Sequence, residues 1–183
     1  MAVKKSRKRW VIMIIVIIAV VVIVGIVLSR GSCSPSDSTI QSQQAPDFTL
    51  PTLAGANVTL SELEGVPVVL NFWATTCGHC LRELPYFEAV AQESEQEIEV
   101  LAVNVGQSAS MIQTFFGDYE LTMTIALDEE AKTFSTYSLR DNPRGYIPFT
   151  VFVDREGIVR HLQVGAFGTE ATLWDKLDSL FEL

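Results

Sequence analysis

The stretch VPVVLNFWATTCGHCLRELPYF, residues 66–87, decides the fold class of this chain. Residues 66–73 are rich in β-branched and aromatic residues and almost continuously apolar, which predicts a strand that is buried on both faces. Cys77 and Cys80 follow the strand, and apolar residues then recur at helical spacing. We therefore predict a helix over residues 77–95, so the two cysteines stand where a buried strand gives way to a helix.

Details of this helix can also be predicted. Thr75 or Thr76 is a suitable N-cap, because a threonine hydroxyl can accept a hydrogen bond from the first turn. Pro85 lies inside the helical pattern, so we expect a kink there.

Strands and helices alternate on either side of this unit. Strands are predicted at 48–50, 57–60, 98–105, 123–127, 149–153 and 158–164, and helices at 109–119, 129–137 and 169–181. The alternation predicts an α/β fold with parallel strands at the centre and an antiparallel hairpin at one side. Residues 46–183 have the length of one domain with one core.

The first 45 residues predict three further segments. Residues 1–9 form a basic cluster, and residues 10–28 carry no charge. As a helix, residues 10–28 would measure about 28 Å, which matches the hydrocarbon core of a bilayer. The positive-inside rule places residues 1–9 in the cytoplasm and the later domain outside the membrane. Residues 29–45, rich in Ser and Gln, are predicted to be a flexible linker.

The third cysteine, Cys33, lies in this predicted linker. It could accept a lipid, but Arg30 stands where a lipoprotein signal usually has a small apolar residue. The alternative is an incidental thiol, which can also pair with another molecule in an exported chain.

Charge is unevenly distributed along the chain. Six of the 13 Lys and Arg residues lie at or before Arg30, whereas all 22 Asp and Glu residues follow it. The exported part therefore carries about −15, which argues against nucleic acid or an anionic membrane surface as its partner. Whether this charge provides solubility or attracts basic protein partners stays open.

The position of the two cysteines favours redox chemistry. The first turn of a helix has unpaired N–H groups and a partial positive charge, which stabilise a thiolate. A cysteine placed there can have a pKa well below about 8.5 and attack as a nucleophile. Cys80 lies one turn after Cys77, within disulfide reach. We expect Cys77 to be exposed and reactive and Cys80 to be covered and to resolve a mixed disulfide.

Two cysteines at this spacing can serve three other purposes. Structural zinc needs four ligands, and His79 and His161 are the only other usual donors, so we expect no metal. A copper carrier could use both thiolates with His161. A purely structural disulfide would close a loop too short to stabilise the fold through chain entropy.

The chain resembles a known family of redox proteins. Residues 68–87 are similar to the active-site strand and helix of thioredoxin. They are more similar still to the membrane-anchored TlpA/ResA-type thiol–disulfide oxidoreductases, in the superfamily that includes the AhpC/TSA and Redoxin-like proteins. The resemblance spans residues 45–183 and includes the motifs APDFTL, VLAVNVG and IPFTVFVDREGIV. It implies a thioredoxin fold with an N-terminal β-hairpin extension and a central βα insertion.

The resemblance also assigns roles to individual residues. Cys77 would be the attacking thiol and Cys80 the buried one, and the two would form the redox-active disulfide. Glu83 would exchange a proton with Cys80; alternatively it is an exposed helix residue that pairs with a cation. Pro148, after Ile147, would be the cis-proline that presents backbone to a substrate.

Trp73 and the CGHC sequence also matter for docking and redox potential. Trp73 would pack beneath the active site. Thr76 stands where the family usually has Trp, which alters the predicted docking surface. Gly78 and His79 form the dipeptide of protein disulfide isomerases, which are more oxidising. His79 near the Cys77 thiolate would favour the reduced form.

The segment SLRDNPRGYIPF, residues 138–149, is longer than the usual lead into the cis-proline. It carries Arg140 and Arg144 and a second proline, Pro143. It could contribute to partner choice or be a tolerated insertion.

The resemblance implies an extracytoplasmic reductase of disulfides in exported proteins, such as the haem-site cysteines of apocytochrome c. A membrane electron donor of the CcdA or DsbD type would renew its reduced state, and no cofactor beyond the cysteine pair is expected. A disulfide oxidase or isomerase and a copper-carrying thioredoxin-like protein are the alternatives. A thiol peroxidase is disfavoured, because Ala74 stands where that chemistry needs Thr or Ser.

Overall fold

The computed structural model describes residues 40–94, 97–117, 119 and 121–181. The predicted cytoplasmic segment and membrane anchor, residues 1–28, lie outside these ranges. Among the described residues, no helix combines the length and the apolar character of a membrane span. The described residues group by their contacts into one compact unit.

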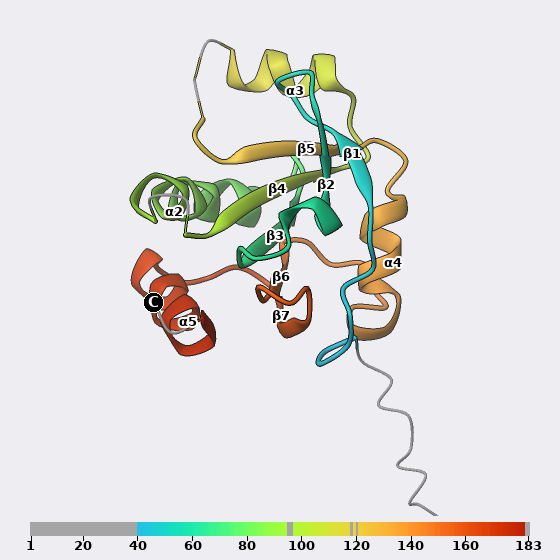
Figure 1. Ribbon diagram of the computed structural model, residues 1–183. Helices are drawn as coiled ribbons and strands as arrows, with labels where there is room; N and C mark the ends of the chain where they lie inside the picture. Colours follow the sequence, from blue (N-terminus) through green and yellow to red (C-terminus); the bar gives the residue numbers. More distant parts are fainter. Residues whose placement is uncertain (1–39, 95–96, 118, 120, 182–183) are drawn as a thin grey trace, which may run out of the picture. The chain divides into compact units, whose positions relative to one another are not determined.

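A five-stranded sheet forms the centre of this unit, in the order β5-β4-β3-β6-β7 (Figure 1). The strands are β3 (Val68–Trp73), β4 (Glu99–Val105), β5 (Thr124–Asp128), β6 (Phe149–Val153) and β7 (Val159–Val164). β3, β4 and β5 are parallel, whereas β6 pairs antiparallel with β3 and β7 pairs antiparallel with β6. The predicted α/β thioredoxin-like fold is therefore confirmed.

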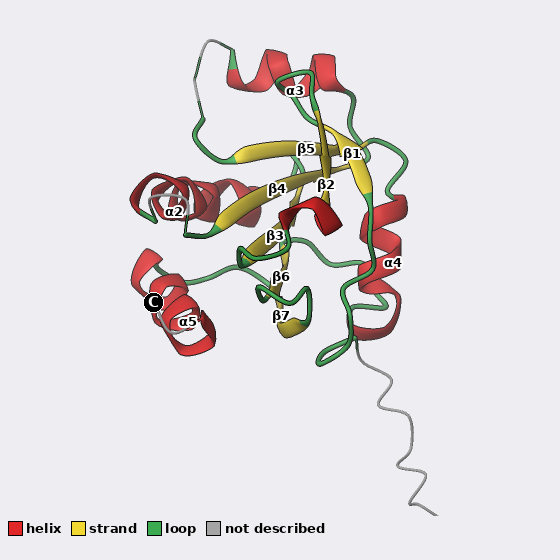
Figure 2. Ribbon diagram, viewed as in Figure 1, coloured by secondary structure: helices red, strands yellow, loops and turns green. Residues whose placement is uncertain are grey.

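Helices cover both faces of this sheet. They are α2 (Gly78–Glu93), α3 (Ala109–Phe116), α4 (Lys132–Asp141) and α5 (Glu170–Phe181). α2 and α5 lie on one side of the sheet and α4 on the other (Figure 2). This arrangement explains the nearly continuous apolar run of β3, all six residues of which are buried.

Side chains of β3 alternate between two cores. Val69 and Trp73 pack with α2 and α5, whereas Leu70 and Phe72 pack with α4. Asn71 lies between Val69 and Trp73 on the α2 side, so this otherwise apolar row carries one buried amide.

A hairpin precedes the sheet. β1 (Thr49–Pro51) pairs antiparallel with β2 (Asn57–Thr59), and a 3₁₀ helix, η1 (Leu60–Leu63), follows. The connection turns at Gly55, whose φ of +88° favours glycine. The predicted N-terminal hairpin extension is present. Between β4 and α4 the chain forms α3 and β5, and that these two make up the predicted central insertion stays a prediction.

Residues 40–45, which the sequence assigned to the flexible linker, pack on the domain. Ala45 donates its N–H to the Gly157 carbonyl at 2.8 Å, and Gln44 bridges to Ile158. Ile40 is 6% exposed. Contacts with the domain therefore begin at least five residues before the predicted boundary at residue 46.

Several predicted helix ends differ from the structure, and three of the differences have a local reason. The N-cap of α2 is Cys77 rather than Thr75 or Thr76, because the Cys77 sulfur accepts the first-turn N–H of Cys80. α3 ends at Phe116 rather than residue 119, because Gly117 has a φ of +59°.

α4 runs over Lys132–Asp141 rather than the predicted 129–137. Ala131 before it adopts the left-handed conformation (φ +55°), which a continuous helix cannot include. The Asp128 carboxylate accepts the Phe134 N–H at 2.8 Å and thereby caps the first turn of the helix.

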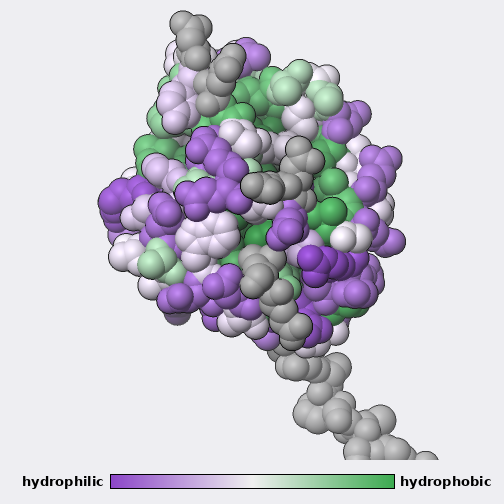
Figure 3. Space-filling view, turned by 60° about the vertical axis from the view of Figure 1, so that its left-hand side comes forward, coloured by the Kyte–Doolittle hydropathy of each residue, from purple (hydrophilic) through white to green (hydrophobic). Residues whose placement is uncertain are grey.

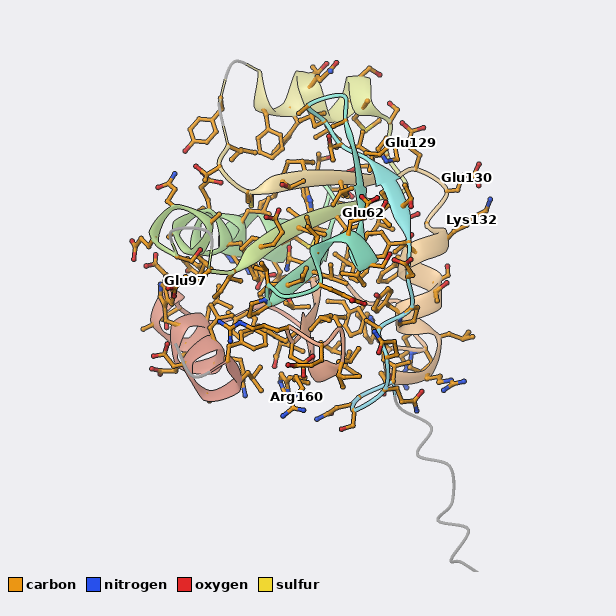
Figure 4. All side chains as sticks on the ribbon, viewed as in Figure 1. Glu62, Glu97, Glu129, Glu130, Lys132 and Arg160 are labelled. Atoms are coloured by element: carbon orange, nitrogen blue, oxygen red, sulfur yellow. A yellow bond between two sulfur atoms is a disulfide. The ribbon has the colours of Figure 1, made fainter. Side chains whose placement is uncertain are left out.

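The described surface carries many charged side chains, and most of them form no ion pair. Figure 4 labels Glu130 and Lys132, which form an ion pair at the start of α4, and Arg160, which lies 3.6 Å from Asp154. These two are the ion pairs within the described part of the chain. The face on the α2 and α5 side mixes hydrophilic and hydrophobic residues (Figure 3).

Candidate active site

Cys77 and Cys80 form a disulfide at the junction of β3 and α2, with their Cα atoms 5.3 Å apart. Cys77 is partly exposed, whereas Cys80 is fully buried. The Cys77 sulfur accepts the Cys80 N–H at 3.1 Å. The predicted asymmetry is therefore present: one sulfur can be reached by another protein and the other cannot.

The end of α2 gives Cys77 its chemistry. As the N-cap, its sulfur lies against the unpaired N–H groups of the first turn and the positive end of the helix dipole. When the disulfide is reduced, these groups stabilise a thiolate at Cys77.

The segment before β6 lies against the reactive sulfur. The Ile147–Pro148 peptide bond is cis, at the position where the sequence predicts it. The Ile147 carbonyl oxygen lies 3.6 Å from Cys77 Sγ. In the disulfide this sulfur has no proton to donate, but the reduced thiol has one. Among the described residues, no hydrogen bond of the Ile147 N–H is found.

Glu83 lies one turn after Cys80 and is fully buried. Its Oε1 accepts from Asn71 Nδ2 at 2.9 Å, and its Oε2 accepts from the Phe167 N–H at 2.8 Å. Burial raises the pKa of Glu83 to about 7, against the opposing effect of these two hydrogen bonds. The alternative of an exposed glutamate paired with a cation is wrong. Such a carboxyl can gain or lose a proton near neutral pH.

Trp73 lies beneath the site, as predicted, but it cannot belong to the docking surface. Its side chain is fully buried and packs in the same core as Cys80. The rings of Phe115 and Phe116 lie 6.2 and 5.7 Å from it. Thr76, by contrast, is exposed beside Cys77.

Both residues of the Gly78-His79 dipeptide are exposed. His79 Nδ1 lies 2.6 Å from Arg82 Nη2. A guanidinium can only donate, so this ring nitrogen accepts. The contact found for His79 is thus with Arg82, which brings a permanent positive charge to the first turns of α2.

Sequence reasoning missed Gln107, which holds the loop before the cysteines. Its Oε1 accepts the Thr75 N–H at 2.8 Å, and its Nε2 donates to Thr75 Oγ1 at 2.7 Å. Asn104 Nδ2 also donates to this Oε1, at 3.0 Å. The available signal was that Gln107 follows β4: the carboxyl ends of adjacent parallel strands meet at one sheet edge.

The long lead into the cis-proline is an ordered turn. The buried side chain of Asn142 accepts the Tyr146 N–H at 3.0 Å and donates to the Tyr146 carbonyl at 2.6 Å. Gly145 between them has a φ of +65°. Arg140 and Arg144 are exposed on this segment.

The described residues contain no group of three or more His, Cys, Asp or Glu side chains that could hold a metal ion. His161, the ligand suggested for copper, lies on β7 with its ring 5.9 Å from that of Phe152. Burial and the nearby Lys176 lower the pKa of His161.

Comparison with known proteins agrees with this geometry. The family model described as AhpC/TSA family matches residues 42–162, about two thirds of the chain. The chain belongs to the AhpC/TSA family.

Relatives of this AhpC/TSA-family chain indicate which class of protein within the family it resembles. It is 34% identical over 141 residues to the thioredoxin-like protein YneN of Bacillus subtilis (strain 168), covering 75% of this chain and 79% of YneN. It is 29% identical over 167 residues to the thiol-disulfide oxidoreductase ResA of Geobacillus kaustophilus (strain HTA426), covering 91% and 93% of the two chains.

Solved structures give the same result. A Chlorobium tepidum protein assigned as the thiol:disulfide interchange protein DsbE has a TM-score of 0.66 and 27% identity, covering 76% of this chain and 96% of its own. The exposed lipoprotein thioredoxin Etrx1 of Streptococcus pneumoniae strain TIGR4 has a TM-score of 0.64 and 27% identity, covering 74% and 100%. With its CxxC pair at disulfide distance, this AhpC/TSA-family chain is a thiol–disulfide oxidoreductase of the ResA/DsbE type.

Proposed function

We propose that the chain is a membrane-anchored, extracytoplasmic reductase of disulfides in exported proteins. One observation carries the proposal: the partly exposed Cys77 sulfur lies at the start of α2 and beside the Ile147 carbonyl, and its disulfide partner Cys80 is buried one turn from Glu83. The first cysteine is placed to attack and the second to resolve.

The reaction follows from these positions. The Cys77 thiolate attacks one sulfur of the substrate disulfide, forms a mixed disulfide and releases the other substrate sulfur as a thiolate, which takes up a proton. Cys80 gives its proton to Glu83 and attacks Cys77 Sγ. The second substrate sulfur leaves, and the Cys77–Cys80 disulfide forms. Two electrons pass to the substrate.

Substrate binding would use the backbone beside the cis-proline. The Ile147 N–H can donate to a carbonyl of an extended substrate segment. Thr76 and the ordered turn at Tyr146 flank this position.

The proposed location of the domain outside the cytoplasm is supported by the sequence and by one protein of similar structure. Residues 10–28 have the length and composition of a membrane span. Etrx1 is described as an exposed lipoprotein, which supports an extracytoplasmic domain here. Outside the cytoplasm the dithiol must be renewed, which implies a membrane electron donor of the CcdA or DsbD type. Apocytochrome c is the substrate class that the TlpA/ResA resemblance favours.

A second candidate function is a disulfide oxidase or isomerase. The observation that favours it is the Arg82 guanidinium beside His79, in the first turns of the helix that follows the reactive Cys77. Positive charge there stabilises the Cys77 thiolate, and a more stable reduced form makes the disulfide a stronger oxidant.

The reduction potential of the Cys77–Cys80 pair separates the two functions. The full chain in detergent is equilibrated with glutathione buffers, and the fraction reduced is measured by thiol alkylation. A potential near or below about −230 mV supports the reductase, whereas about −180 to −120 mV supports the oxidase or isomerase.

Substrate class needs a separate assay. The reduced full chain is mixed with an apocytochrome c peptide whose haem-site cysteines are oxidised, and with an unrelated disulfide peptide of equal length as the control. Faster reduction of the haem-site peptide is expected. Equal rates would contradict apocytochrome c specificity and leave the reductase function in place.

A further inference from the structure

Asn71 is a fully buried amide that the reaction above does not use. Its Nδ2 donates to Glu83 Oε1 at 2.9 Å and to Thr150 Oγ1 at 3.1 Å. Its Oδ1, equally buried, has no hydrogen-bond partner among the described residues. An unpaired buried carbonyl destabilises a folded protein, so an unpaired Oδ1 beside a titrating acid requires an explanation.

The two protonation states of Glu83 need different partners. As a carboxylate, Glu83 accepts from Asn71 and from the Phe167 N–H, as observed. As a neutral acid, it must donate one proton. The Phe167 N–H is itself a donor, so it cannot accept this proton from Oε2. At Oε1, the group in place is the Asn71 NH₂, which is also a donor.

We propose that the Asn71 side-chain amide turns over when Glu83 gains a proton. In the turned orientation Asn71 Oδ1 accepts from the Glu83 Oε1–H and from the Thr150 hydroxyl, which is now the donor. The rotation transfers no electrons, and the proton comes from Cys80 or from solvent.

The two orientations are nearly balanced. Oδ1 is unpaired when Glu83 is ionised, and Nδ2 is unpaired when Glu83 is neutral, so each state leaves one amide atom without a partner. Asn71 therefore favours neither protonation state strongly. It acts as a positioning residue that keeps Glu83 in one place while the proton moves.

Charged groups on the neighbouring elements do not explain the behaviour of Glu83. They are Arg82 and Glu88 on α2, Glu99 on β4, Arg160 and His161 on β7, and Glu170, Asp175, Lys176 and Asp178 on α5. None of them is among the causes of the raised Glu83 pKa, which are burial and two opposing hydrogen bonds. Cys80, one turn away, is the titratable group that exchanges protons with Glu83 when the disulfide is reduced.

A titration of the oxidised protein tests the proposal directly. The full chain in detergent, labelled with ¹³C,¹⁵N-asparagine and ¹³C-glutamate, is followed by NMR from pH 5 to 9. The Asn71 Nδ2 and Cγ resonances are expected to shift with the same midpoint as the Glu83 carboxyl carbon. An Asn71 amide that stays constant while Glu83 titrates overturns the proposal, as does a Glu83 that does not titrate in this range.

Variants test the consequence for exchange. Asn71→Leu removes the hydrogen-bond partner of Glu83 in both protonation states of that carboxyl. We therefore expect the reduction rate of a disulfide peptide to fall about tenfold, the effect of one hydrogen bond. Asn104→Leu is the matched control, because Asn104 is a fully buried asparagine on β4 whose Oδ1 is also unpaired but whose Nδ2 donates to Gln107.

The Glu83 midpoint gives a second readout. Because the turning amide serves both protonation states, Asn71→Leu should leave this midpoint nearly unchanged, as Asn104→Leu should. A midpoint that is raised in Asn71→Leu alone would show an amide that only donates to the carboxylate, and would overturn the proposal. If Asn71→Leu does not fold, the NMR titration of the unaltered chain still decides the question. The effect on the rate of thiol–disulfide exchange rests on the proposed function. The titration uses no substrate, so a chain without reductase activity can still show the turn of the amide.

Discussion

Gln107 and Thr75 exchange two hydrogen bonds, from the Thr75 N–H to Gln107 Oε1 at 2.8 Å and from Gln107 Nε2 to Thr75 Oγ1 at 2.7 Å. Thr75 stands two residues before Cys77, so the loop after β4 holds the loop that leads into the cysteines. This relationship joins parts of the chain 32 residues apart.

Gln107→Ala is expected to destabilise the fold by about 1–3 kcal/mol, because it removes the acceptor of the Thr75 N–H and of the buried Asn104 amide. Urea denaturation of the oxidised protein measures the loss. Gln113→Ala, the same change at an exposed position of α3, is the control and should alter stability by no more than about 0.5 kcal/mol. Equal effects of the two variants would contradict the assigned role of Gln107.

Glu83 makes stability depend on pH. Its folded-state pKa of about 7 lies above the ordinary 4.5, so the folded protein binds this proton more tightly than the unfolded chain does. The contribution of Glu83 to stability is therefore full below about pH 4.5 and is lost as pH rises through about 7. The loss is on the order of 3 kcal/mol. Denaturation midpoints of the oxidised protein from pH 4 to 8 measure it, and Glu83→Gln should remove this pH dependence; an unchanged profile would contradict it.

The two cysteines are expected to behave differently on substitution. Cys77→Ser removes the attacking sulfur and should abolish disulfide reduction. Cys80→Ser leaves the attack intact but removes resolution, so mixed disulfides with substrate should accumulate. Non-reducing gels and mass spectrometry of the trapped species measure this difference. Full activity of Cys77→Ser would contradict the mechanism.

Tyr137 ties α4 to the segment before β1, since its hydroxyl donates to the Pro46 carbonyl at 2.6 Å. The Tyr137→Phe variant should lose about 1 kcal/mol of stability, the net value of one hydrogen bond. Thermal or urea unfolding measures the change. Tyr119→Phe, at a residue that is 66% exposed, should have almost no effect; a similar loss there would show that the Pro46 contact is not the cause.

Strand and helix positions were largely predictable, because buried positions appear in the sequence as apolar residues at regular spacing. The apolar run of β3 and the helical spacing after Cys80 predicted their elements to within a few residues. Helix ends were less predictable: α4 begins at Lys132 because Asp128 and Ala131 adopt a local geometry that hydrophobic periodicity does not encode.

Residues of the active site also differ in how well the sequence predicted them. Cys77, Cys80 and Pro148 were predicted from a motif, since their spacing and neighbours are local. Gln107 was missed, because its partner Thr75 lies in the loop after a different strand, β3, and a lone glutamine carries no pattern. Trp73 was expected to contribute to docking from beneath the site, but the packing of α3 and α2 buries its side chain.

The sequence by itself determined the α/β fold and the CxxC pair at a helix start, because hydrophobic periodicity and cysteine spacing are properties of short segments. Only the tertiary structure decided the environment of that pair. It buried Glu83 between Asn71 of β3 and the Phe167 N–H before α5, and it set Ile147 against Cys77. The pKa of Glu83 depends on burial by residues far apart in the chain, and no local pattern records that burial.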